Sequence, residues 1–245
     1  MNPNEITVHI MEQNESFWIG YSLQALTQFF PHIFVYDTGS TDGTLEIIKS
    51  FPTVTLVEMG VLDRFQLGDC RNEMMRATKT PWVLQQDGDE YYPPSSLRQM
   101  LNFVMPEGKK LGFTLFYETG WDGKNFRAIA RREQQHLTSV KFNRAAVLWH
   151  EARYSGGYPF ENPDVFDNSE LFHYFPDEVV GYHLHHLLRS SKDDEVYLRK
   201  QKRDQFCLMD REVELGEVLD IEFQGDWSNP YLDYLKGRKN ETSKS

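Results

Sequence analysis

Cysteine is scarce in this chain, whose 245 residues include only Cys70 and Cys207. The two lie far apart and form no CxxC or zinc-type spacing, so nothing indicates the disulfide framework of a small secreted domain. Long hydrophobic runs are also missing, because the longest, such as 111–117, fall far short of the roughly 20 residues that a membrane helix needs. The first residues show no basic region followed by an apolar stretch, which predicts neither a signal peptide nor a transmembrane segment. We therefore expect a soluble, cytoplasmic protein.

Positive charge is in deficit as well. The chain has 26 Lys and Arg against 37 Asp and Glu, a formal net charge of −11 at pH 7. Such a chain gains little from the phosphate attraction that drives nucleic-acid binding, although a local basic face would still allow it. No GxGxxG segment is present, which disfavours a dehydrogenase. With 40% hydrophobic and 14% aromatic residues, the chain has enough apolar material for a large buried core.

The first hundred residues alternate between short β-rich runs and helix-like stretches. Strands are predicted at 6–11, 32–36, 53–58 and 82–86, and helices at 17–30, 44–50, 69–78 and from 93 onward. This alternation predicts an α/β fold with a mostly parallel central sheet flanked by helices. The second half is expected to be antiparallel and rich in loops, with a hairpin between 111–117 and 126–131, a loop at 155–176 and a helix after Ser191.

Two loops at predicted carboxyl ends of strands carry the polar chemistry, at the place where open α/β sheets bind ligands. The first loop, 36–44, begins with Asp37, which is placed to accept hydrogen bonds from a base or a ribose. Its glycines permit close approach, and its Ser, Thr and Asp residues are natural caps for the next helix. A well-capped turn without a ligand is the alternative interpretation of this loop.

The second loop contains Asp87-Gly88-Asp89, directly after the buried-looking strand 82–86. Two aspartates spaced in this way can turn both carboxylates toward one hard cation, and an oxygen-only set suits Mg²⁺ or Mn²⁺ that bridges to substrate phosphates. Between the two loops, Arg71 stands near the start of a predicted helix, where it can pair with a diphosphate. The alternatives are a chance Asp-x-Asp pair and an ordinary surface arginine.

Together these segments resemble family 2 glycosyltransferases with the GT-A fold, in particular bacterial enzymes that act on cell-surface glycans. The resemblance lies in Asn14-Glu15, DTGSTDGT, a Gly-x-x-Arg-Asn helix start and WVLQQDGDE, in the family's order and spacing, over residues 5–151. We expect one catalytic domain at 1–235, with a nucleotide-sugar-binding half at 1–104, an acceptor half with a C-terminal helix at 105–235, and a flexible tail at 236–245.

The resemblance implies a nucleotide-sugar site made by Glu12, Asp37, Thr38, Asp42, Arg71, Asp87 and Gly88. In this site Asp37 would contact the base or ribose, while Asp87 and Asp89 would hold Mn²⁺ or Mg²⁺ on the diphosphate. Members of this fold often complete the metal shell with a late histidine, which nominates His183 or His185. Histidines on a half-buried surface are more often structural, and that is the alternative for both.

The attacking hydroxyl needs a carboxylate base on the far side of the sugar. Arg131-Arg132 and the later Trp149-His150-Glu151 resemble the arginine pair and the His-Glu of related members, which nominates Glu151 as the base of an inverting transfer. The alternatives are a structural Glu151 paired with those arginines, and Asp164 or Asp167 as the base.

The resemblance therefore predicts a metal-dependent, inverting glycosyltransferase that moves a sugar from a UDP-sugar to a hydroxyl of a glycan or glycolipid. Another acceptor in the same class is a hydroxymethylated base in bacteriophage DNA, which the basic cluster at 199–203 favours and the net charge of −11 disfavours; such an enzyme would act in the host cytoplasm. A nucleotidyltransferase would need a basic Gly-rich phosphate loop, which 9–15 lacks. A non-catalytic sugar-nucleotide-binding protein is the alternative outside enzymes.

Overall fold

The computed structural model of the chain describes residues 1–63, 65–133, 136–139, 141–155, 162–164, 168–184, 187, 214–229 and 231–233. The helix expected after Ser191 and the tail expected at 236–245 lie outside these residues, so both stay predictions, as does the division of the chain into two halves.

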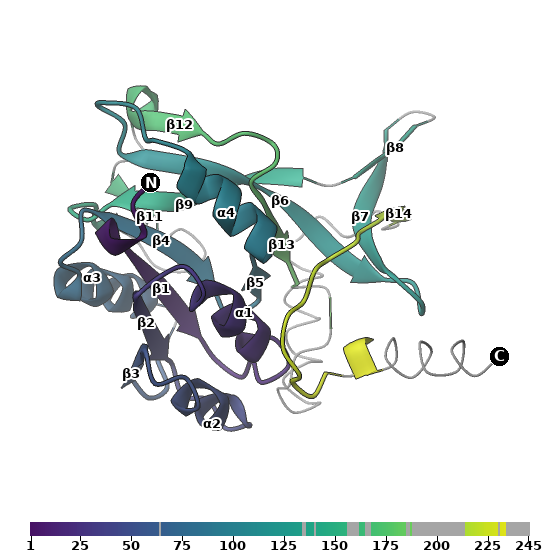
Figure 1. The fold of residues 1–245 in the computed structure, drawn as a ribbon, viewed down its shortest axis with the longest axis horizontal. Helices are drawn as coiled ribbons and strands as arrows, with labels where there is room; N and C mark the ends of the chain where they lie inside the picture. Colours follow the sequence, from purple (N-terminus) through teal and green to yellow (C-terminus); the bar gives the residue numbers. More distant parts are fainter. Residues whose placement is uncertain are drawn as a thin grey trace.

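A large mixed sheet forms the centre of the structure (Figure 1). Its strands are β1 (Ile6–Glu12), β2 (His32–Asp37), β3 (Val54–Glu58), β4 (Trp82–Asp87), β5 (Glu90–Tyr91), β6 (Leu111–Trp121), β7 (Phe126–Glu133), β8 (His136–Ser139), β9 (Lys141–Trp149), β12 (Phe172–Tyr174), β13 (Val180–His183) and β14 (Glu214–Val218). A separate pair is formed by β10 (Tyr154–Ser155) and β11 (Asn162–Pro163). The helices are α1 (Ile19–Leu26), α2 (Thr44–Lys49), α3 (Leu67–Ala77) and α4 (Pro94–Asn102), with 3-10 turns at Pro3–Glu5 and Ser169–Leu171.

The main path through the sheet runs β14-β7-β6-β9-β4-β1-β2-β3. Strand β1 pairs in parallel with β2 and β4, and β2 pairs in parallel with β3, which confirms the predicted parallel half. The predicted hairpin is also confirmed, because Thr119 to Trp121 pair antiparallel with Phe126 to Ala128. Strand β9 was not predicted, and it lies antiparallel between β4 and β6.

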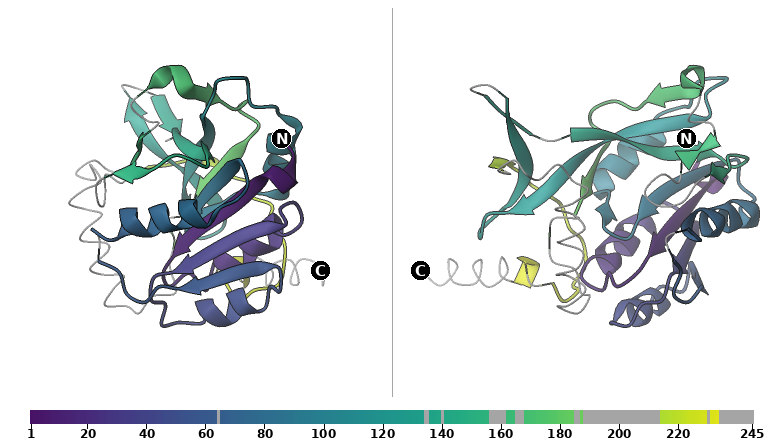
Figure 2. Two further views of the ribbon diagram at one scale, coloured as in Figure 1. Left: turned by 90° about the vertical axis from the view of Figure 1, so that its left-hand side faces the viewer. Right: turned by 180° about the vertical axis from the view of Figure 1, so that it is seen from behind.

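Helices cover both faces of the parallel strands (Figures 1 and 2). Helices α1, α2 and α4 pack on one face, because Leu23, Ile48 and Leu97 belong to one core cluster with Val8 and Ile10 of β1. Helix α3 packs on the opposite face, in two smaller clusters with side chains of β2 and β4. The hairpin of β6 and β7, together with β8 and β14, extends away from this parallel half (Figure 2).

A C-terminal segment, 219–229, lies across α1 and is held by hydrogen bonds to backbone oxygens. The Tyr21 hydroxyl donates to the Trp227 oxygen at 2.6 Å, and the Asn229 side chain donates to the Phe17 oxygen at 2.8 Å. The Trp227 ring lies directly on Gly20, where any side chain would collide with it. The glycine is therefore required by close packing between distant parts of the chain.

Replacing Gly20 by Ala should lower the melting temperature by roughly 2–10 °C, because overpacking typically costs about 1–3 kcal/mol. The added Cβ would lie 2.4–2.7 Å from three ring atoms of Trp227, whose backbone is tied to α1 and cannot easily move. Gly43→Ala is the matched control, since its nearest neighbour would be 3.8 Å away and its φ is −81°. Equal melting temperatures for Gly20→Ala and wild type in calorimetry would contradict this packing.

Candidate functional site

The carboxyl ends of β1, β2 and β4 meet at one edge of the sheet and bring most of the predicted polar residues together. The parallel register sets Glu12 opposite Asp37 and Met11 opposite Asp87. Because parallel strands end at the same edge, residues about 25 and 75 positions apart in the chain become neighbours there.

The Asp37 loop is organised by hydrogen bonds within the loop. One Asp37 carboxylate oxygen accepts from the backbone of Gly39 at 2.9 Å and Ser40 at 3.0 Å. Thr38 donates through both its backbone N–H and its hydroxyl to the backbone carbonyl oxygen of Glu12, each at 2.9 Å, which ties the loop to β1. Asp42 accepts from Thr44 at 2.9 Å at the start of α2. The loop is thus a well-capped turn that also presents a buried carboxylate at the strand edge.

Glu12 and Asp37 form a buried carboxyl pair, only 4% and 2% exposed. Burial, followed by the hydrogen bond and charge of Asp37, raises the pKa of Glu12 to about 10. Burial opposes ionisation of Asp37, but hydrogen bonds from Glu12, Ser40 and Gly39 outweigh it and lower the pKa of Asp37. At neutral pH the pair therefore holds one proton and one negative charge.

Glu12→Gln should stabilise the fold at pH 8 and change it little at pH 5. The folded pKa of Glu12 lies above its unfolded value, so its contribution to stability is complete below about pH 4.5 and is lost as pH rises toward 10. At pH 7 ionisation of Glu12 stabilises the unfolded chain and so lowers the free energy of unfolding by up to about 3 kcal/mol. Gln does not ionise, so the variant avoids this loss, and its amide can still donate to Asp37. Thermal melts at both pH values measure the difference. An equal gain at pH 5 and pH 8 would contradict the protonated state.

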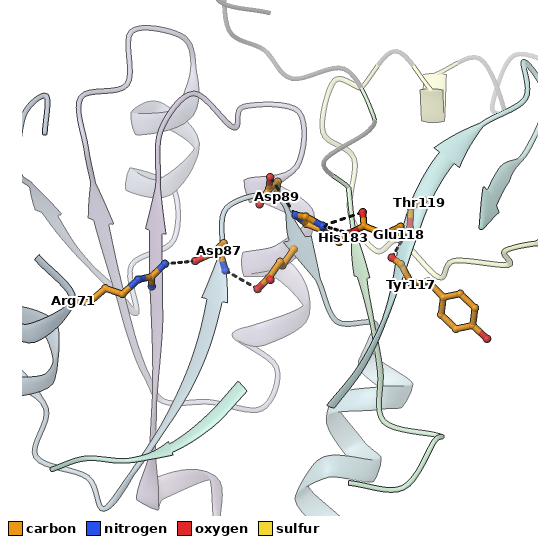
Figure 3. Close-up of polar contacts among 8 residues, drawn as sticks. Arg71, Asp87, Asp89, Tyr117, Glu118, Thr119 and His183 are labelled. Atoms are coloured by element: carbon orange, nitrogen blue, oxygen red, sulfur yellow. Dashed lines mark hydrogen bonds and ion pairs between the residues drawn. The ribbon is translucent and has the colours of Figure 1, made fainter. Parts of the chain in front are cut away.

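Asp87 is paired with Arg71 on α3 (Figure 3). A guanidinium nitrogen of Arg71 lies 2.7 Å from Asp87 Oδ1, and the two side chains are 6% and 33% exposed. The backbone N–H of Asp87 donates to the Glu90 carboxylate at 2.9 Å, which closes the turn after β4. Arg71 is therefore a buried partner of Asp87, and its predicted contact with the donor stays a prediction.

Asp89 has a different partner, His183 of β13, on the other side of the turn (Figure 3). Nε2 of His183 lies 3.7 Å from Asp89 Oδ2. Its Nδ1 lies 3.0 Å and 3.1 Å from the two carboxylate oxygens of Glu118 on β6. Burial would lower the pKa of His183, but Asp89 and then Glu118 raise it well above the ordinary value. Asp87 and Asp89 thus face different side chains, Arg71 and His183, and their predicted convergence on one ion stays a prediction.

Gly88 is needed between the two aspartates for reasons of space. A Cβ at this position would lie 2.5 Å from Glu12 Cβ and 2.8 Å from Glu15 Cγ. These are atoms near the backbone of the β1 end and of the loop that follows it. The absence of a side chain at Gly88 therefore lets the ends of β1 and β4 approach closely.

The structure places Glu151 away from this site. Trp149 of β9 pairs with Trp82 at the first residue of β4, and His150 donates to the Pro81 oxygen. Asp87 is five residues further along β4, roughly 16 Å at the usual rise per residue. Glu151 is exposed and accepts a hydrogen bond from Trp149, so it lies at the opposite end of the strands and is not the base at this edge.

The structure does not describe all of the predicted residues. His185 and Asp167 lie outside the described residues, as does the basic cluster at 199–203. Asp164 is exposed, and its carboxylate accepts from the backbone of Arg153 at 3.0 Å.

Sequence reasoning missed Glu118, which comes directly after the apolar run 111–117 that was interpreted as a strand. Its signal was a carboxylate next to a buried strand, because such a group requires a partner.

No group of three or more His, Cys, Asp or Glu side chains converges as a ready-made metal site in the described part of the chain. Among the same residues no helix is both long enough and apolar enough to span a bilayer. A cavity of about 430 Å³ lies between α1, the β6–β7 hairpin and the C-terminal segment, and none of the acidic site residues lines it.

Comparison with known proteins decides the class of this chain. The sequence profile of the family described as "Glycosyl transferase family 2" matches residues 10–180, well over half of the chain. This chain belongs to glycosyl transferase family 2. Both the family and the mixed α/β sheet agree with what the motifs predicted, and the matched range contains the whole acidic edge from Glu12 to Asp89.

Solved structures with a similar fold are distant in sequence. S. aureus TarS is 18% identical over 61% of this chain and 30% of its own, with a TM-score of 0.43. The mannosyltransferase PcManGT from Pyrobaculum calidifontis, in complex with GDP-Man and Mn²⁺, is 19% identical over 45% of this chain and 35% of its own, with a TM-score of 0.38. Glucosyl-3-phosphoglycerate synthase from Mycobacterium tuberculosis is 15% identical over 72% and 68%, with a TM-score of 0.43.

The chain thus spans about a third of the length of the first two of these proteins. A comparison with curated protein sequences found no match.

The side chains at Asp89 fit a divalent cation as part of a shell. A carboxylate and an imidazole face one another at 3.7 Å, and the second imidazole nitrogen is held by a carboxylate, which is the usual arrangement of a metal-binding histidine. With Asp89 and His183 as its protein ligands, a bound ion would take its remaining ligands from phosphate oxygens and water, as is common for Mg²⁺ and Mn²⁺ at nucleotide sites.

Proposed function

We propose that this glycosyltransferase is metal-dependent and moves a sugar from a nucleoside-diphosphate donor, with UDP-sugars as the first candidates, to an acceptor hydroxyl. The observation that supports this is the contact between Asp89 and His183, backed by Glu118, at the edge where the parallel strands end. Asp89 and His183 would hold Mn²⁺ or Mg²⁺ there. The ion would neutralise charge that develops on the leaving diphosphate when the bond to the sugar breaks.

The proposed nucleoside site is the Glu12–Asp37 pair. With one proton held by Glu12, the Asp37 carboxylate is the acceptor that a ribose hydroxyl or a base N–H can approach. Asp87 would face the donor between this pair and Asp89, with its charge balanced by Arg71. Burial of Glu12 and Asp37 excludes water and fixes their direction before the donor arrives, which would strengthen their hydrogen bonds to it.

We further propose an acceptor hydroxyl on a glycan or glycolipid, inversion at the anomeric carbon, and a cytoplasmic location. These follow from the family resemblance and not from the contacts at the site. Inversion requires a carboxylate base on the face of the sugar opposite the diphosphate, and Glu151 does not supply it. Comparison of donor and product anomeric configurations by NMR tests inversion.

The function is tested by a screen of donor hydrolysis across UDP-, GDP- and CDP-sugars, with Mn²⁺, with Mg²⁺ and with EDTA. We expect one nucleotide series to be hydrolysed and EDTA to stop the reaction. Calorimetry with the free nucleotides should show tighter binding when Mn²⁺ is present. Hydrolysis that continues unchanged in EDTA would overturn the metal dependence, and no hydrolysis or binding of any nucleotide would overturn the donor class.

A further inference from the structure

Glu118 contacts His183 with both of its carboxylate oxygens, in a geometry that restrains the ring. The distances from Nδ1 are 3.0 Å and 3.1 Å, and the two side chains are only 19% and 22% exposed. The two residues are register partners, because β13 pairs in parallel with β6 and sets His183 opposite Glu118. The contact is therefore built into the sheet and does not depend on a long, flexible side chain.

The backbone of His183 is fixed on three sides. Strand β13 lies between β6 and β5, and the residue after His183 donates its N–H to the Asp89 oxygen at 2.7 Å. Gly181 lets β13 approach β6 closely, since a Cβ there would lie 2.3 Å from the Phe116 ring. With the backbone held, the remaining freedom of His183 is rotation of its side chain.

An imidazole can bind a cation through either nitrogen, and the hydrogen bond made by one nitrogen decides which is available. Since Nδ1 faces Glu118, Nε2 is the nitrogen that faces Asp89 (Figure 3). Without Glu118 the His183 ring could turn about its side-chain bonds, or its proton could move from one ring nitrogen to the other. Either change would remove Nε2 from the side of Asp89.

We propose that Glu118 is a positioning residue, whose carboxylate holds His183 so that Nε2 is presented to the divalent cation beside Asp89. This rests on the proposed metal-dependent function, because it assigns the support of one ligand of that ion. It also predicts a preference for Mn²⁺ over Mg²⁺, because an imidazole ligand suits Mn²⁺ better than the all-oxygen shell that Mg²⁺ favours.

The test is Mn²⁺ binding, measured by electron paramagnetic resonance on the full chain with UDP present, so that it does not depend on turnover. Removal of a carboxylate that supports a metal-binding histidine typically weakens the metal by 10–100-fold. We expect Glu118→Gln to weaken Mn²⁺ by about tenfold, since Gln can still accept one hydrogen bond, and to weaken Mg²⁺ less. Glu118→Asp keeps the negative charge, but its shorter side chain cannot reach Nδ1 of His183, so it should weaken Mn²⁺ binding similarly. It replaces Glu118→Gln as the test if the Gln variant does not fold.

Action through His183 is tested by a double-mutant cycle. If Glu118 works only by holding the ring, Glu118→Gln should add nothing to the loss of Mn²⁺ affinity caused by His183→Ala. Glu107→Gln is the matched control, because Glu107 is exposed in the loop before β6 and undergoes the same chemical change. UDP binding in EDTA should be equal in all variants.

The outcomes separate the two proposals. If wild type binds no Mn²⁺ in the presence of UDP, the proposed metal dependence fails. If wild type binds Mn²⁺ and both Glu118 variants bind it equally well, the positioning role alone is overturned. Additive losses in the double variant would likewise overturn it, because Glu118 would then act by a route other than His183.

Discussion

Asp89→Asn is expected to abolish the stimulation of donor binding by Mn²⁺ and to reduce turnover by at least about 10²-fold. A metal that neutralises a leaving group contributes several kcal/mol to the transition state, and each 1.4 kcal/mol is a factor of ten in rate. Asn keeps the size of Asp and can still contact His183, so the fold should survive. Its amide lacks the negative charge that a hard cation requires.

Calorimetric titration of UDP with Mn²⁺ and with EDTA checks this expectation. The two affinities should be equal in Asp89→Asn and should differ in wild type. Asp177→Asn, at an exposed position in the loop before β13, removes the same charge away from the site and should behave like wild type. Mn²⁺-stimulated binding that persists in Asp89→Asn would show that Asp89 is not a ligand.

Asp87→Asn distinguishes the two aspartates within the same experiment. Asp87 faces Arg71 at 2.7 Å and not His183, so its loss should weaken UDP binding with and without metal. The ratio of affinities with Mn²⁺ and EDTA should then stay close to that of wild type. A collapse of that ratio in Asp87→Asn, as expected only for Asp89, would mean that the two carboxylates converge on one ion when the donor is bound.

Gly88→Ala is expected to damage the nucleoside site and the proposed metal site together, and to lower the melting temperature. The new Cβ would lie 2.5 Å from Glu12 Cβ and 3.4 Å from Glu12 Cα, so the ends of β1 and β4 would have to separate. Neither atom is the far end of a flexible side chain, and overpacking of this kind costs about 1–3 kcal/mol. The shift would move Glu12 away from Asp37 on one side and Asp89 away from His183 on the other.

Two measurements follow from this geometry. The affinity for UDP should fall at least about tenfold in EDTA as well as in Mn²⁺, which differs from the effect expected for Asp89→Asn. The melting temperature should fall by several degrees, because a cost of about 1–3 kcal/mol translates into a shift of that size in a chain of this length. Wild-type UDP affinity in Gly88→Ala would mean that the strand ends are not held as closely as the structure shows.

The parallel half of the fold could be predicted from the sequence because its signals are local. Alternation of apolar runs with amphipathic stretches marks β1 to β4 and the helices between them. Asp37 and Asp87 to Asp89 could be found for the same reason, since residues at the ends of parallel strands share one edge wherever the strands are. The motifs of the family lie in this half.

The sequence by itself therefore determined the family of this chain and the acidic edge at which the parallel strands end. Only the tertiary structure decided which side chains face one another there. The direction of β9 sends Glu151 to the far end of the strands, and the register of β13 brings together Glu118 and His183, which are 65 residues apart in the chain, beside Asp89. Such pairings depend on which strands become neighbours and on their register, and these arise from packing of the whole sheet and leave no local pattern in the chain.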